Sequence, residues 1–316
     1  MDNDVHKFSY CGIWVRNNDY EARLDTALVP RLREDAEIFK ENIMRVRNLG
    51  ALLPEVAYWI HIGSRINSVA TANIGRKIEL PGRVCGAPPA DQALIDERLR
   101  QYEAWPKIPA DQAWQDGCDL VRSIVDLAPQ HHGLGLQALL GAMLQETWSA
   151  FEGGLIETWT TAVNLSPDPL GKNMLAGDKT LAVSQLERYA FNVSNNLGDI
   201  LKDSPGKVDL ASFSGIKKAY STAFAKELDT SEIFAQFDPL LSHFEAVRHL
   251  LAHRAGRVDT RFLRRVQNSP NLKDFEVGQM LALDGEMVSE FTKAAVECFV
   301  QVHVAVDRFV SKAIAD

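Results

Sequence analysis

Residues 248–259 read RHLLAHRAGRVD and bring together groups suited to proton transfer beside a phosphate. Arg248 and His253 stand five positions apart, with His249 next to the arginine. A histidine gains or loses a proton near neutral pH, and an arginine can bind two phosphoryl oxygens at once. We therefore treat Arg248, His249 and His253 as the first candidate site.

Positive charge continues beyond these three residues. The segment 248–265 holds six arginines and one aspartate, a local net charge of +5 in a chain whose net charge is -8. Such a concentration predicts a phosphate-binding surface within an otherwise acidic protein. The arginines that we expect to contact RNA phosphates are Arg254, Arg257, Arg261 and Arg264.

Two other interpretations of this segment stay open. A basic end is favourable for any helix, because the helix dipole attracts positive charge at its C-terminus, so the segment could be a solvated helix end. His249 and His253, four residues apart, could instead bind a metal from one helix face, although the H-E-x-x-H zinc motif is absent. His303 and Asp307 form a similar pair, for which we expect a surface location.

The motif must be positioned by a helix over residues 239–255. Its apolar residues Leu240, Phe244, Val247 and Leu251 recur on one face, and Gly256 is a natural stop. At about 100° per residue, Arg248 and His253 are roughly 140° apart, whereas His249 and His253 share a face.

The rest of the chain also shows helical spacing of apolar residues. The clearest example is an apolar stripe between Leu136 and Val163, interrupted by Gly153 and Gly154, which predict close backbone packing or a kink. Further helices are expected over 19–69 with interruptions at Pro30 and Pro54, over 91–104, from an N-cap near Asp111, over 180–201, over 209–224, and from an N-cap at Asp284 towards Ala315.

We therefore predict an all-α protein. A break near residue 129 divides it into a mostly helical N-terminal region, 1–128, and a C-terminal helical bundle, 129–316. Residues 80–92 are expected to form a loop, and residues 8–15 a short strand.

Composition limits the classes of function. Hydrophobic residues make up 46% and charged residues 24% of the 316, as in soluble globular proteins. The four cysteines form no C-x-x-C pair, no signal-peptide core is seen, and no apolar run reaches the roughly 18 residues of a membrane span. We expect a cytoplasmic protein with no membrane association. Nucleotide-binding glycine motifs are absent, and we expect no cofactor.

The segment RHLLAHRAGRVDTRFLRRV resembles the signature of the HEPN superfamily, which is an Arg, a polar residue, three residues and a His. Those positions are Arg248, His249 and His253. The segment WSAFEGGLIETW at 148–159 is similar to the first long HEPN helix, and LALDGEMVSEF at 281–291 to the start of the last one. The resemblance covers about residues 130–316.

This resemblance implies a dimeric helical bundle with metal-independent endoribonuclease activity. Two motifs would meet at the dimer interface, and the RNA 2′-hydroxyl would attack the adjacent phosphate to leave a 2′,3′-cyclic end. Arg248 and His253 would be catalytic, and His249 would orient the RNA or the second motif. The roles of other HEPN proteins also suggest that this protein is a toxin or phage-defence effector with an antitoxin or regulatory protein as its partner. Regulation through a Tyr two positions after the motif His is not expected, since Ala255 occupies that position.

Two alternatives remain beside this reading. The chain could be a HEPN module that has lost catalysis and binds RNA, a nucleotide or a protein partner. It could also be a helical metal-binding enzyme built on His249 and His253.

Overall fold

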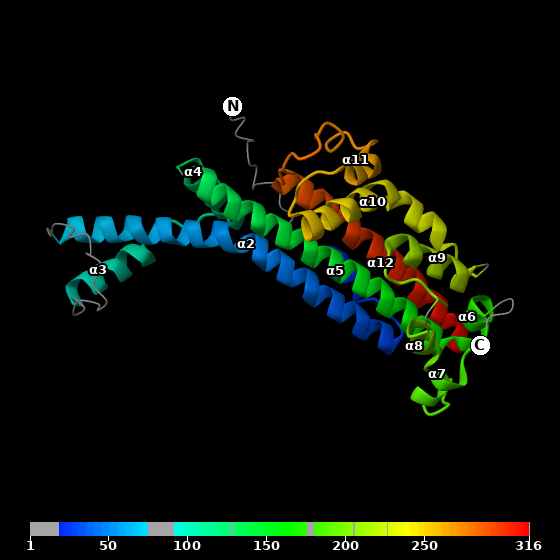
Figure 1. The fold of residues 1–316 in the computed structure, drawn as a ribbon. Coiled ribbons are helices and arrows are strands. Elements are labelled where there is room, and N and C mark those ends of the chain that lie inside the picture. Colours follow the sequence, from blue (N-terminus) through cyan, green and yellow to red (C-terminus); the bar gives the residue numbers. More distant parts are fainter. Residues whose placement is uncertain are drawn as a thin grey trace. The chain divides into compact units, whose positions relative to one another are not determined.

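The computed structural model describes residues 19–74, 92–127, 129–175, 180–204, 206–225 and 227–315. These residues form helices and no strand, which confirms the all-α prediction, and none of the helices is both long and apolar enough to cross a membrane (Figure 1). The elements are α1 (Asp19–Leu24), α2 (Pro30–Asn73), α3 (Gln92–Glu103), α4 (Ala110–Leu127), the π-helical turn η1 (Pro129–Gly133), α5 (Leu134–Leu165), α6 (Pro167–Met174), α7 (Val183–Arg188), α8 (Leu197–Lys202), α9 (Phe213–Phe224), α10 (Thr230–Arg254), α11 (Thr260–Val266) and α12 (Gly285–Ala315).

Contacts divide the described residues into two compact units. The larger unit comprises residues 19–50 together with 135–315, and the smaller unit lies within residues 51–134. The helix α2 begins in the larger unit and ends in the smaller one. The motif helix α10 belongs to the larger unit.

The core of the larger unit is built on α5. All eight positions of its predicted apolar stripe are buried, which confirms the stripe: Leu136, Leu140, Met143, Thr147, Phe151, Leu155, Trp159 and Val163. Gly154 is needed because a Cβ there would lie 2.8 Å from Phe299 Cε2 on α12, whereas a Cβ at Gly153 would meet nothing. Of the two effects expected from this glycine pair, close packing is therefore observed at Gly154.

Aromatic rings connect α5 to the motif helix. The Trp148 ring of α5 meets the Phe244 ring of α10 edge-on at 5.1 Å between centroids. Phe244 in turn stacks on Phe291 of α12 at 4.9 Å. Edge-to-face and offset-stacked rings stabilise a core beyond their buried area. These contacts hold α10 against both α5 and α12, and Figure 1 draws α10 beside α12.

The last helix begins where the sequence predicted. Asp284 Oδ1 accepts a hydrogen bond from Met287 N at 2.7 Å, which is the geometry of an N-cap. Apolar side chains along α12 are buried, among them Phe291, Ala295, Cys298, Val302 and Val306.

Four predictions about helix boundaries were wrong. Pro54 does not interrupt α2, and the motif helix begins at Thr230 instead of Pro239, which lies in its interior. The helix expected over 180–201 consists of two short helices, α7 and α8, separated by turns with left-handed residues at Ala190, Phe191 and Asn195. The N-cap expected at Asp111 is also displaced, because this residue lies in the first turn of α4.

Some predictions fall outside the described residues. They are the strand over residues 8–15 and the loop over 80–92, except for Gln92, which already belongs to α3.

Candidate functional site

The motif helix α10 is fixed at both ends by local interactions. At its start, Asp229 Oδ1 accepts hydrogen bonds from Ser231 N at 3.0 Å and Glu232 N at 3.2 Å. At its end, Ala255 (φ 48°) and Gly256 (φ 78°) are left-handed and turn the chain away. Glycine adopts this conformation without the steric cost that a Cβ imposes. The predicted stop at Gly256 is therefore one residue beyond the actual C-cap, Ala255.

The loop after α10 is held against the segment that leads into α12. Val258 N donates to the Gln279 carbonyl at 2.9 Å, Leu281 N donates to the Gly256 carbonyl at 2.9 Å, and Arg257 pairs with Met280 in an isolated antiparallel bridge. These bonds satisfy backbone groups that the turn would otherwise leave unpaired. They hold the loop that follows the motif in place.

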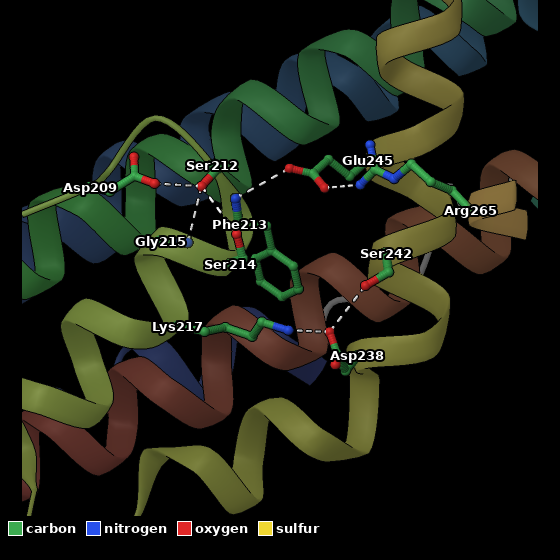
Figure 2. A network of polar contacts seen from close by, with 10 residues as sticks. All are labelled: Asp209, Ser212, Phe213, Ser214, Gly215, Lys217, Asp238, Ser242, Glu245 and Arg265. Atoms are coloured by element: carbon green, nitrogen blue, oxygen red, sulfur yellow. Dashed lines mark hydrogen bonds and ion pairs between the residues drawn. The ribbon is translucent and has the colours of Figure 1, made fainter. Parts of the chain in front are cut away.

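A polar network links α9, α10 and α11 at the level of the motif (Figure 2). The Glu245 carboxylate of α10 accepts a hydrogen bond from Phe213 N, at the start of α9, and pairs with Arg265 of α11. Ser212 caps α9 by accepting from Gly215 N at 3.1 Å. Glu245 stands one turn before Arg248, so the network orients the part of α10 that carries the motif.

Arg248 points towards α5. Its guanidinium carbon lies 5.5 Å from the centroid of the Trp148 ring, within the range of a cation–π contact. Its Nε atom is buried and has no hydrogen-bond partner among the described residues. Burial raises the pKa of the Glu152 carboxyl on α5, and the positive charge of Arg248 opposes this shift.

The two histidines of the motif lie together, with ring centroids 4.4 Å apart. Partial burial lowers the pKa of His249, and the positive groups of His253, Arg261, Arg248 and Arg265 act in the same direction. A lowered pKa leaves more of the imidazole neutral at pH 7, and a neutral imidazole can accept a proton. His253 is exposed to solvent.

The predicted RNA-binding arginines differ in their surroundings, although all four are exposed. Arg254 lies 3.6 Å from the Asp259 carboxylate, which also caps α11. Arg257 and Arg264 reach backbone carbonyls at 3.5 and 3.3 Å. For Arg261, no polar partner is found in the described part of the chain. Within the residues that the structure describes, Arg257, Arg261 and Arg264 thus form no ion pair with a carboxylate, and their positive charges are not neutralised.

The structure therefore brings part of the predicted site together. His249 lies beside His253, and the positive charges of Arg248 and Arg261 help to lower its pKa. Arg248 faces Trp148 whereas His253 is exposed, so the two ends of the motif are on different faces of α10. His249 stands between them.

Sequence reasoning missed two acidic residues of this region. Glu152 is placed four residues after Trp148, on the same face of α5, and Glu245 three residues before Arg248 on α10. The signal available was a glutamate inside or beside an apolar helix face. That signal does not show which arginine lies opposite.

The histidine–aspartate pair on α12 has a structural role. His303 and Asp307 are 0% and 3% exposed, so the expected surface location was wrong. The Asp307 carboxylate accepts hydrogen bonds from Leu28 N and Val29 N just before α2, and His303 Nδ1 lies 2.9 Å from Thr158 Oγ1. Within the described residues, no three His, Cys, Asp or Glu side chains gather as metal ligands would.

Two surface hollows were found away from the motif residues. One, of about 660 Å³, lies in the smaller unit and is lined by residues such as Tyr58, Arg65 and Trp105. The other, of about 560 Å³, lies in the larger unit and includes Arg23 and Arg308. Neither is lined by Arg248, His249 or His253, so a molecule bound at the motif would occupy a different surface.

No model of a known protein family, no curated protein and no solved structure matches the chain with significant similarity.

Proposed function

We propose that the chain is a metal-independent endoribonuclease of the HEPN type that acts as a homodimer. The observation that carries this proposal is the composition of one end of α10. There, Arg248, His249 and His253 lie within two turns of one helix. Further arginines, among them Arg261 and Arg265, lie close enough to affect the pKa of His249. The combination supplies a proton acceptor and a phosphate binder without requiring a metal.

The reaction would be an internal displacement at phosphorus. The 2′-oxygen of the RNA forms a bond to the adjacent phosphorus while the bond from phosphorus to the 5′-oxygen breaks. A base removes the proton of the 2′-hydroxyl, and an acid gives a proton to the departing 5′-oxygen. The products are a 2′,3′-cyclic phosphate and a 5′-hydroxyl end.

A homodimer would supply both proton-transfer groups from one sequence. We assign the base to His253 and the acid to the partner's His253, on opposite sides of the phosphate. Arg248 would neutralise charge on the phosphoryl oxygens, which grows in the transition state. His249 would orient the RNA or the second motif.

A second candidate function is an RNA-binding module without catalysis. One observation favours it. The Arg248 guanidinium lies over the Trp148 ring, so part of its charge is already used inside the protein. An arginine with this role could be kept for packing alone. The exposed charges of Arg257, Arg261 and Arg264 would still attract RNA.

The test is the chemistry of the products. Purified protein is incubated with a single-stranded RNA and with the matching DNA, in an excess of a metal chelator. The proposal predicts that RNA is cut to 2′,3′-cyclic phosphate and 5′-hydroxyl ends and that DNA, which lacks the 2′-hydroxyl, is not. RNA binding without cut ends would support the second candidate. Activity that disappears in chelator and returns with zinc or manganese would support a metal enzyme based on His249 and His253.

A further inference from the structure

The larger unit has a hollow of about 560 Å³ where α1, the start of α10 and the second half of α12 meet. Its apolar surface includes Ile233, Val304 and Ala305, all of them half-buried. Small-molecule sites in proteins are hollows of this size that combine an apolar surface with a few polar groups. The polar groups of this hollow therefore decide which molecule it can bind.

Hydrogen bonds and an ion pair hold the walls of the hollow in place. The Asp307 carboxylate on α12 accepts hydrogen bonds from Leu28 N and Val29 N, both at 2.9 Å, just after α1. Arg23 on α1 pairs with Glu297 on α12 at 2.7 Å. These contacts fasten α1 and the chain that follows it to α12. The hollow is thus formed before a ligand binds, and little has to be ordered on binding.

Two guanidinium groups supply the hydrogen-bond donors of the hollow. Arg308 is exposed and forms no hydrogen bond or ion pair with the described residues. Arg23 bonds both Glu297 oxygens through Nη1 alone, at 2.7 and 2.9 Å, so within the described part of the chain its Nε and Nη2 make no hydrogen bond. An arginine carries five N–H donors, and its planar fork fits the oxygens of a carboxylate or a phosphate. The hollow therefore offers donors for an anion.

The charges around the hollow favour an anion with a single charge. Arg23 and Arg308 contribute two positive charges and Glu297 one negative charge, and none of the described residues that line the hollow is acidic. The balance of these three groups is +1. A carboxylate matches this balance at pH 7, whereas a phosphate monoester carries a charge of about −1.5 to −2.

We propose that this hollow binds a small organic carboxylate. The carboxylate accepts hydrogen bonds from Arg308 and from Nε and Nη2 of Arg23, and the carbon part of the ligand lies on Ile233 and Val304. The proposal does not rest on the ribonuclease function, because no residue of the motif lines the hollow.

Benzoate is the probe, and benzamide, which has the same shape without the charge, is its control. Binding to the full-length protein is followed by NMR of isoleucine methyl groups, with the Ile233 signal assigned by its loss in Ile233→Leu. Benzoate should shift this signal and bind at least about tenfold more tightly than benzamide, because hydrogen bonds to a charged acceptor are stronger. The signal of Ile38, which is exposed on α2, should stay in place. Equal affinities for the two compounds would overturn the proposal.

Arg308→Gln tests the guanidinium that has no partner in the described residues. Because this side chain is exposed, the variant should fold, and benzoate should bind to it roughly tenfold more weakly. Arg264→Gln is the matched control, since it removes an equally exposed arginine from α11, on the proposed RNA-binding surface. If Arg264→Gln weakened benzoate binding as much as Arg308→Gln, the anion would respond to the net charge of the protein and not to this hollow.

A gain of affinity is expected when the competing carboxylate is removed. Glu297 pairs with Arg23 and accepts a hydrogen bond from Gln301 Nε2 at 2.8 Å. Glu297→Gln keeps an acceptor for Gln301 but raises the charge balance from +1 to +2, so benzoate should bind roughly threefold more tightly or better. The ion pair is 42% and 39% exposed, so its loss should change the unfolding midpoint little. Weaker benzoate binding in a folded Glu297→Gln would contradict a site between Arg23 and Arg308.

Phenyl phosphate separates carboxylates from phosphates. It should bind no more tightly than benzoate, because its charge of about −1.5 to −2 exceeds the balance of the hollow. Clearly tighter binding of phenyl phosphate at the Ile233 signal would overturn the assignment to carboxylates. If benzoate produced no saturable shift of that signal up to a concentration on the order of 10 mM, which is a weak limit even for so small a ligand, the site itself would be refuted.

Discussion

Gly154 of α5 lies against the ring of Phe299 on α12, so closely that a Cβ at position 154 would come within 2.8 Å of Phe299 Cε2. We expect Gly154→Ala to lower the free energy of unfolding by about 1–3 kcal/mol, because the ring has to move in a packed core. Urea unfolding monitored by circular dichroism measures this change.

Gly153 provides the control for this prediction. A Cβ there would meet no other atom within 4 Å. Gly153→Ala should therefore raise the free energy of unfolding by about 0.5–1 kcal/mol, since alanine has less backbone freedom to lose in a helix. If Gly154→Ala stabilised the protein as much as Gly153→Ala, the close packing of Gly154 against Phe299 of α12 would be contradicted.

His303 should make the stability depend on pH. Burial lowers its pKa to about 4, whereas an unfolded histidine titrates near its ordinary value of 6.5. Between these values the unfolded chain binds a proton that the folded protein does not, so the free energy of unfolding falls as the pH falls from about 6.5 to 4. The loss is at most about 3 kcal/mol. Urea unfolding at a series of pH values should show that His303→Gln removes this component.

Asp35 is the natural comparison for His303. Burial raises its pKa from 3.8 to about 6, so the folded protein binds this proton more readily than the unfolded chain. Its effect has the opposite sign, because stability increases as the pH falls from about 6 to 3.8. Asp35→Asn and His303→Gln should therefore change the slope of stability against pH in opposite directions. Slopes that change in the same direction would contradict both assignments.

The proposed dimer should bring two copies of the C-terminal end of α10 together. Ala252 is exposed and precedes His253, so Ala252→Cys should be linked across the dimer by a short bis-maleimide. Ala313→Cys, exposed near the end of α12, is the control and should link poorly. Sedimentation at micromolar concentration gives the oligomeric state. A monomer, or linkage through Ala313→Cys alone, would count against facing motifs.

RNA affinity should depend on the arginines that carry unneutralised charge. Replacing Arg257, Arg261 and Arg264 by Ala should reduce the slope of log K against log salt concentration by about 2 for a single-stranded RNA, because fewer counterions are released. Fluorescence anisotropy over a range of salt concentrations measures this slope. An equal loss of charge elsewhere, in Lys172, Arg308 and Lys312 replaced by Ala, should leave it nearly unchanged. If both triple variants reduce the slope equally, RNA affinity depends on the net charge of the protein and not on the surface formed by Arg257, Arg261 and Arg264.

The helices that the sequence predicted best are those whose own residues define them. The stripe of α5 repeats from Leu136 to Val163 without a breaker strong enough to end it, and every position of the stripe is buried. Asp284 marks the start of α12 because its side chain bonds a backbone N–H three residues later. Both signals are local, so the sequence contains them in full.

The boundaries that were missed depend on contacts between distant residues. Pro54 leaves a backbone carbonyl of α2 without its usual donor, yet the helix continues where Gly117 of α4 packs against it, so closely that a Cβ at Gly117 would lie 2.3 Å from the Pro54 oxygen. Packing of this kind can stabilise a helix against a poor local residue. The sequence does not show which glycine lies opposite which proline.

In the candidate site too, residues that share one segment could be predicted, whereas residues brought close by packing could not. Arg248, His249 and His253 were found because they share one short segment, and the cluster of arginines because it is continuous. The apolar face of α10 was half correct, since Phe244 and Val247 are buried but their buried companions are Leu241 and Leu250. Glu152 precedes Arg248 by nearly a hundred residues, and only the packing of α5 on α10 relates them.

The most direct test of the proposed function is a comparison of RNA cleavage and RNA binding in His253→Ala, Arg248→Ala and the wild type, all in excess chelator. His131→Ala, which removes an exposed histidine of η1, is the control. We predict that His253→Ala lowers the cleavage rate at least about 100-fold, because it removes proton transfer, and changes the Kd for RNA little. Arg248→Ala should weaken both, because it removes a phosphate contact. A His253→Ala variant that cleaves RNA as fast as His131→Ala, to the same 2′,3′-cyclic ends, would contradict the assignment of the active site to α10.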